Sequence, residues 1–168
     1  KIKNCEPLHL LSLISHLEAA GVKIKTGLDW INVLKPSKLS AIDVKTREYP
    51  GFATDLQAPF TVLLTQAEGK SQVHETIFDG RLEYAPELIR MGANITLCDP
   101  HRIIVLGPTL LHGREVESPD IRAGWAFVIA GLVANGRTIV HNVYNIDRGY
   151  EAIEQKLSLL GADIKRIQ

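Results

Sequence analysis

Hydrophobic and polar positions along the chain describe a unit that recurs at a nearly constant interval. Its clearest marker is the end of an apolar-periodic helix followed by a glycine, at Gly21, Gly92 and Gly161. The first two glycines are 71 residues apart (92 minus 21), and the last two are 69 residues apart (161 minus 92). A β-prone run of residues follows each glycine. Because glycine readily adopts the left-handed conformation that ends a helix, the pattern predicts three equivalent helix ends.

Two further landmarks recur at nearly the same offset. Residues 67–74 return as residues 134–141, an offset of 67, and residues 55–58 return as residues 120–123, an offset of 65. Three landmarks that recur in one order indicate an internal repeat in which each copy is one structural unit.

The units cover approximately residues 1–47, 48–112 and 113–168 of a single domain, and we predict the order βαβαββ for each. The predicted helices cover residues 55–67, 84–91, 120–134 and 149–160. The predicted strands cover residues 22–25, 30–34, 71–78, 94–98, 102–106, 138–144 and 164–167. The first unit has a second helix without a first, so we expect it to be truncated, with N-terminal residues missing.

The first helices of the two complete units indicate the architecture. Residues 56–67 and 121–134 are apolar on nearly every helical face, which is typical of a helix that is buried all round. The sequence therefore predicts an α/β fold in which these helices lie centrally, with sheets outside. Pro59 falls past the first turn of its helix and should bend the helix or delay its start.

Composition narrows the possible functions. The chain has 168 residues, 45% of them hydrophobic, and its 19 basic residues balance its 19 acidic ones. A net charge of zero gives no support to a nucleic-acid or membrane partner. The longest apolar run, residues 123–134, is shorter than a membrane span. Cys5 and Cys98 lack the spacing of a zinc or redox motif, and the histidines show no metal-ligand spacing. Because the cysteines form no disulfide framework and no signal for export is found, the default expectation is a cytoplasmic location.

The first turns of the two apolar helices hold candidate chemistry. Thr54 and Gln57 have the spacing of a capping box around Asp55. Asp55 is then either a first-turn acid that favours the helix dipole or a general base that meets a substrate hydroxyl. In the next copy, Ser118 is a natural cap with Pro119 at the first helical position.

Three arginines form a second candidate group. Arg122 begins an otherwise apolar helix, so it either pairs with Asp120 or presents a planar fork to a carboxylate or phosphate. Arg81 and Arg148 are related by the repeat offset of 67 and lie just past a predicted strand, in Asp79-Gly80-Arg81 and Asp147-Arg148-Gly149. They are either surface ion pairs or, together with Arg122, an anion clamp at one edge of the fold.

Five ordered motifs match a known family. They are Gly51-Phe52-Ala53-Thr54-Asp55-Leu56-Gln57, His74-Glu75-Thr76-Ile77-Phe78-Asp79-Gly80-Arg81, Pro86-Glu87-Leu88-Ile89-Arg90-Met91-Gly92-Ala93, Asp120-Ile121-Arg122-Ala123-Gly124 and Ile146-Asp147-Arg148-Gly149-Tyr150. Through almost the whole chain they closely resemble the UDP-N-acetylglucosamine 1-carboxyvinyltransferase family of enolpyruvyl transferases. The resemblance implies transfer of the enolpyruvyl group of phosphoenolpyruvate to the 3-hydroxyl of UDP-N-acetylglucosamine, without a cofactor or metal. It also implies a role in peptidoglycan and cell-wall synthesis, and so in cell shape and division.

The resemblance further implies a fold and a set of residue roles. Six βαβαββ units would form two inside-out α/β barrels, of which this chain is most of the C-terminal-containing domain. Asp55 would be the catalytic base and Ile77 a backbone contact to the nucleotide. Arg81, Arg122 and the catalytic Arg148 would lie near phosphoenolpyruvate. Asp120 would orient Arg122.

Two departures and a missing part qualify this expectation. Ala53 replaces a usual proline, and Asp79-Gly80-Arg81 replaces Glu-Asn-Arg. The family's mobile loop, with its reactive cysteine or aspartate, belongs to the partner domain, so this chain alone should be inactive. The alternatives are the shikimate-pathway enolpyruvyl transferase and a non-catalytic relative that binds a sugar nucleotide.

Overall fold

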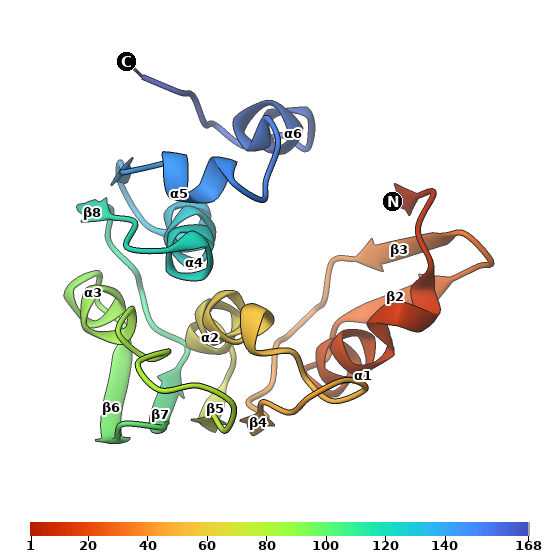
Figure 1. Ribbon diagram of the computed structural model, residues 1–168, viewed down its shortest axis with the longest axis horizontal. Coiled ribbons are helices and arrows are strands. Elements are labelled where there is room, and N and C mark those ends of the chain that lie inside the picture. The colour runs from red at the N-terminus through yellow and green to blue at the C-terminus, as the bar shows by residue number, and fades with distance from the viewer. Residues whose placement is uncertain (168) are drawn as a thin grey trace.

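A computed structural model describes residues 1–167, and three successive units of helices and strands follow one another along it (Figure 1). The first unit comprises β1 (Ile2–Lys3), the short 3₁₀ helix η1 (Pro7–Leu10), α1 (Leu11–Ala19), β2 (Lys23–Thr26) and β3 (Trp30–Leu34). Its three strands form an antiparallel sheet in the order β1-β3-β2. This unit contains the second half of the predicted repeat.

The middle unit shows the complete predicted order, but its first strand begins at Val44, a few residues before the approximate boundary predicted at residue 48. It comprises β4 (Val44–Lys45), the 3₁₀ turn η2 (Thr54–Leu56), α2 (Gln57–Thr65), β5 (Gly69–His74), α3 (Ala85–Arg90), β6 (Asn94–Asp99) and β7 (Arg102–Gly107). The sheet order is β4-β5-β7-β6, with β4 parallel to β5 and the other pairs antiparallel. The βαβαββ prediction is therefore confirmed for this unit.

The last unit departs from the prediction near its end. It comprises β8 (Glu115–Glu117), α4 (Ile121–Val133), β9 (Ile139–His141), α5 (Tyr144–Asp147) and α6 (Ile153–Leu159), with β8 parallel to β9. The strand predicted at residues 164–167 is wrong, because this segment pairs with no other strand of the described chain. Instead, Arg166 ties the segment to Asp147 and Glu154 by ion pairs.

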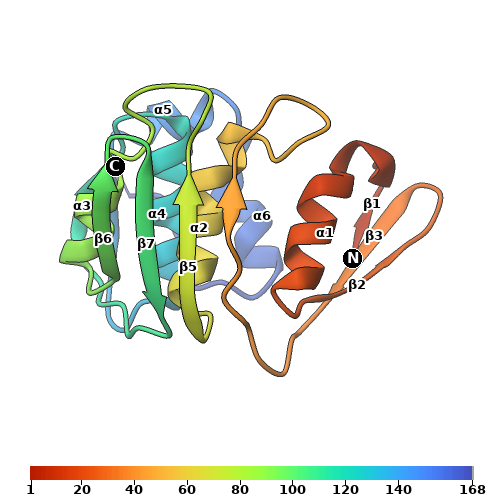
Figure 2. The same ribbon diagram turned by 90° about the horizontal axis from the view of Figure 1, so that it is seen from below.

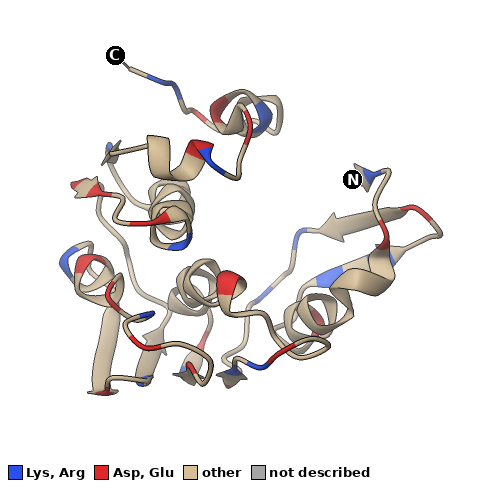
Figure 3. Cartoon of the chain, in the orientation of Figure 1, with Lys and Arg blue, Asp and Glu red and all other residues tan. Residues whose placement is uncertain are grey.

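The two apolar helices lie inside, as the sequence predicts. Figure 2 shows the four-stranded sheet in front of α2, and α2 packs against α4 on its other side. All residues of α2 except Leu63 are buried, and the helix begins at Gln57 after a 3₁₀ turn, which is the delayed start predicted from Pro59. In Figure 3 charged residues lie at the starts of the two helices rather than along them. The charged groups of both helices therefore gather at one end.

The three glycine stops are also confirmed. Gly21, Gly92 and Gly161 have positive φ angles of 95°, 106° and 96°. In each case the amide after the glycine donates to a carbonyl five residues back, as from Val22 to Leu17 at 2.9 Å. No helix of residues 1–167 has the length and apolarity to cross a membrane.

Candidate active site at the starts of the two buried helices

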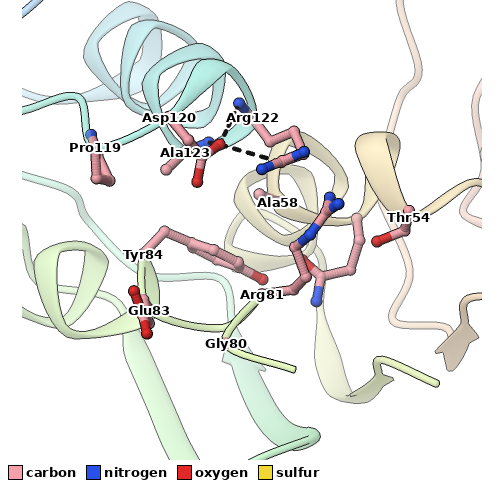
Figure 4. Close-up of a pocket in the computed structure, with 11 residues that line it drawn as sticks. Thr54, Ala58, Gly80, Arg81, Glu83, Tyr84, Pro119, Asp120, Arg122 and Ala123 are labelled. Carbon is pink, nitrogen blue, oxygen red and sulfur yellow. Dashed lines mark hydrogen bonds and ion pairs between the residues drawn. The ribbon is translucent and has the colours of Figure 1, made fainter. Parts of the chain in front are cut away.

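A pocket opens where α2 and α4 begin, beside the loop that follows β5 (Figure 4). Each helix contributes the same three positions of the repeat, at the offset of 65. They are Thr54, Gln57 and Ala58 from the start of α2, and Pro119, Arg122 and Ala123 from the start of α4. The pocket is therefore built by the repeat itself, with Arg81 and Tyr84 closing it from the loop.

Asp55 bridges two arginines at the edge of this pocket. Its Oδ1 lies 3.2 Å from Nη1 of Arg81 and 3.6 Å from Nη1 of Arg122. The Asp55 side chain is 70% exposed, whereas the two guanidinium side chains are only 17% and 27% exposed. The guanidinium of Arg81 also lies 4.5 Å from the ring centre of Phe78. Figure 4 shows Arg81 and Arg122 reaching toward each other across the pocket, so two positive charges converge there.

Asp120 caps α4 and orients Arg122. Its Oδ1 accepts hydrogen bonds from the backbone amides of Arg122 (2.7 Å) and Ala123 (3.2 Å), and from Nε of Arg122 (3.1 Å). The predicted cap at Ser118 is wrong, because it is Asp120 that has the extended backbone of an N-cap. The Ser118 hydroxyl instead donates to the Asp120 carbonyl. Arg122 therefore pairs with Asp120 through Nε and turns Nη1 toward Asp55.

The predicted capping box of Thr54 and Gln57 is wrong as well. The Thr54 hydroxyl donates to Oε2 of Glu75 at 2.8 Å, and no side chain caps η2 or α2. Glu75 is only 1% exposed and also accepts from the Thr46 hydroxyl (2.9 Å) and the Ile77 amide (2.8 Å). This buried carboxylate ties the turn before Asp55 to the turn that contains Ile77. Sequence reasoning missed it, since its partners are up to 29 residues away.

The bond to Glu75 limits what Ile77 can offer a ligand. Ile77 lies in the loop after β5 and does not line the pocket. Because its amide already donates to Glu75, only its carbonyl oxygen could serve the expected backbone contact to a nucleotide.

Arg148 lies apart from the other predicted residues. It follows α5, is exposed and does not line the pocket, and its side chain forms no hydrogen bond or ion pair with any residue from 1 to 167. Its turn is nevertheless close to the start of α4, since a Cβ on Gly149 would clash with the side chain of Ile121. Tyr150 stacks on Trp125 with ring centres 4.8 Å apart. Burial, and to a smaller extent the Asp55 carboxylate, raise the pKa of Tyr150.

The site thus combines anion-binding groups with one accessible carboxylate. Two converging guanidiniums suit a phosphate or carboxylate, and Asp55 is the acid whose side chain remains most exposed beside them. Among residues 1–167 no cluster of three His, Cys, Asp or Glu side chains could hold a metal ion.

Comparison with known proteins identifies the family of the chain. The family model described as EPSP synthase (3-phosphoshikimate 1-carboxyvinyltransferase) matches residues 1–157. The chain belongs to this family. A relative of the chain, the UDP-N-acetylglucosamine 1-carboxyvinyltransferase of Koribacter versatilis (strain Ellin345), is 51% identical over 166 residues, 99% of this chain. The enzyme of the same name from Shewanella sp. (strain ANA-3) is 49% identical over 97% of this chain.

Solved structures of the family confirm the predicted fold. The enolpyruvyl transferase NikO from Streptomyces tendae superposes on 93% of this chain with a TM-score of 0.85 and 29% identity. The EPSP synthase from Acinetobacter baumannii superposes on 94% with a TM-score of 0.68 and 18% identity, which supports the fold alone. The chain spans 38% and 39% of the two relatives named above and 36% of NikO.

Proposed function

We propose that the chain is part of an enzyme that transfers the enolpyruvyl group of phosphoenolpyruvate to the 3-hydroxyl of UDP-N-acetylglucosamine. The observation that carries the proposal is the exposed Asp55 carboxylate beside Arg81 and Arg122, in a chain 51% identical to an enzyme named for this reaction. The reaction would serve peptidoglycan synthesis in the cytoplasm, and through it cell-wall growth, shape and division.

The site residues suit the needs of this reaction. The hydroxyl oxygen of the sugar forms a bond to C2 of phosphoenolpyruvate, the hydroxyl loses its proton, and the phosphate leaves. Asp55 is the group that would accept the hydroxyl proton. Arg81 and Arg122 would hold the anionic groups of phosphoenolpyruvate, with Asp120 fixing the orientation of Arg122. Arg148 would join them if its turn moved toward the pocket.

We further propose that the chain supplies one wall of the active site. The chain spans about two fifths of the relatives named above, which supports this proposal. The remaining part of the enzyme would supply the opposite wall and a general acid. The 168-residue chain by itself should therefore have no turnover.

Phosphate release by the full-length protein tests the proposal. With phosphoenolpyruvate present, we expect release with UDP-N-acetylglucosamine and none above background with shikimate 3-phosphate. The reverse preference would assign the chain to the shikimate-pathway enzyme. Binding of UDP-N-acetylglucosamine without phosphate release would indicate a non-catalytic relative. Turnover by the 168-residue chain alone would overturn the proposal that it is one wall.

A further inference from the structure

Gln57 is a buried polar residue of the pocket whose side-chain nitrogen has no partner in the described chain. It is the first residue of α2, its side chain is 1% exposed, and it lines the pocket together with Arg81 and Arg122. Its Nε2 has no hydrogen-bond partner among residues 1–167. An unpaired amide is costly to bury, and such a group in a binding pocket points to a ligand or an ordered water.

The polar neighbours of Gln57 are already paired with each other. The Thr61 hydroxyl donates to the Gln57 carbonyl at 3.0 Å and lies 2.8 Å from the Tyr84 hydroxyl. Burial raises the pKa of Tyr84, so its phenol keeps its proton. These groups bond to one another, and none of them bonds to the side-chain amide of Gln57.

The repeat supplies an independent reason to assign Gln57 to the ligand. Gln57 and Arg122 occupy equivalent positions, the second residue after Asp55 and after Asp120, and both line the same pocket. Arg122 is held by Asp120 and faces Asp55, whereas Gln57 has no such partner among residues 1–167. An amide N–H and two guanidiniums are all donors, so together they suit a ligand rich in acceptor oxygens.

We propose that Gln57 is a binding residue whose side-chain amide donates a hydrogen bond to an anionic oxygen of phosphoenolpyruvate held by Arg81 and Arg122. This inference rests on the proposed function. It assigns the donor substrate, rather than the sugar nucleotide, to the space between the starts of α2 and α4.

Gln57→Leu in the full-length protein separates binding from stability. Leucine has a similar size but no donor, so the KM for phosphoenolpyruvate should rise about tenfold or more, the effect of losing one hydrogen bond to a charged group. The KM for UDP-N-acetylglucosamine should stay within roughly threefold, a change below the worth of one hydrogen bond. The melting temperature should stay the same or rise, because an unpaired buried amide is removed.

Gln66→Leu is the matched control. The Gln66 amide donates to the Thr65 hydroxyl (2.9 Å) and to the Thr109 carbonyl (3.1 Å), so it is satisfied within the protein. Its loss should lower the melting temperature and leave both KM values unchanged. The two leucine variants should therefore have opposite effects.

Several results would overturn the inference. An unchanged KM for phosphoenolpyruvate in Gln57→Leu would mean that the amide serves only structure or a water. A change in KM confined to the sugar nucleotide would assign Gln57 to the acceptor substrate, and a melting temperature lowered as in Gln66→Leu would reveal a protein partner.

A second variant covers the case in which Gln57→Leu does not fold. Gln57→Glu keeps the size of the side chain, and its negative charge should raise the KM for phosphoenolpyruvate further. Should the wild-type protein release no phosphate, the proposed function fails. Calorimetric binding of phosphoenolpyruvate to wild type and Gln57→Leu then decides the inference by itself.

Discussion

The middle and last units of the chain begin their buried helices with an aspartate at the same place in the repeat, yet the two carboxylates have different surroundings. Asp120 caps its own helix, accepting from two backbone amides, and holds Nε of Arg122. Asp55 caps nothing, is 70% exposed and faces two guanidiniums. One carboxylate is committed to structure, and the other remains accessible to a ligand.

The cause of this difference lies outside the two helices. In the middle unit, Glu75 anchors the turn through the Thr54 hydroxyl, and Asp55 makes no capping bond to that turn. In the last unit, the residue that follows Val140 and His141 is Asn142, so no carboxylate occupies the place of Glu75. The turn of the middle unit therefore has an anchor that the last unit lacks, and its aspartate makes no capping bond.

The largest expected effect comes from removing the accessible carboxylate. Asp55→Asn in the full-length protein should lower kcat by about 10²- to 10⁴-fold, the range expected for a lost general base. Asp120→Asn keeps a capping oxygen and should lower kcat by less than about tenfold, since asparagine is an equally good N-cap. Initial rates of phosphate release measure both. Equal losses in the two variants would contradict the contrast between the aspartates.

Parts of this architecture could be predicted because they depend on local pattern. The glycine stops and the buried α2 follow from residue type and spacing within a few turns, and both were confirmed. Burial on all sides was confirmed only in part for α4, because Leu132 and Val133 near its end are exposed. The strand at residues 164–167 was wrong because a strand needs a partner edge, which local pattern does not reveal. Distant contacts therefore decide where an element lies and what it pairs with, whereas local pattern largely decides whether it is a helix or a strand.

The candidate site shows the same limit. The spacing of Thr54 and Gln57 fits a capping box, but a buried carboxylate 21 residues away takes the Thr54 hydroxyl. Ser118 and Asp120 both suit a cap, and only the backbone conformation selects Asp120. Sequence identified Asp55, Arg81 and Arg122 as candidates, but not the way in which Asp55 bridges the two arginines.

The helix ends of the two units provide the next test. Met91 and Leu160 each precede a glycine stop, but Met91 is fully buried whereas Leu160 is 81% exposed. In the 168-residue chain, Met91→Ala should reduce the free energy of unfolding by about 2–5 kcal/mol, as for other large buried side chains. Leu160→Ala should change it by less than about 0.5 kcal/mol. Denaturant unfolding followed by circular dichroism gives both values, and a large cost at Leu160 would mean that other contacts bury it in solution.

A smaller effect should follow from breaking the link to Glu75. Thr54→Val removes the hydroxyl that donates to the buried Glu75 carboxylate, which should cost about 1.5–3 kcal/mol of unfolding free energy, the worth of a hydrogen bond to a charged group. Thr54→Ser keeps the donor and should recover most of this loss. If the valine and serine variants have the same free energy of unfolding, the Thr54 hydroxyl does not anchor the turn. The explanation of why Asp55 makes no capping bond then fails.

The smallest effect tests the two aspartates as helix caps. Asp120→Ala removes the oxygen that accepts from the amides of Arg122 and Ala123, and should lower the free energy of unfolding by about 1 kcal/mol, the usual value of an N-cap. Asp55→Ala should cost less than about 0.5 kcal/mol, because its pairs with the arginines are largely exposed on the carboxylate side. Denaturant unfolding under one set of conditions compares the two variants. A greater cost at Asp55 would show that its carboxylate stabilises the fold, and that the two units use their aspartates alike.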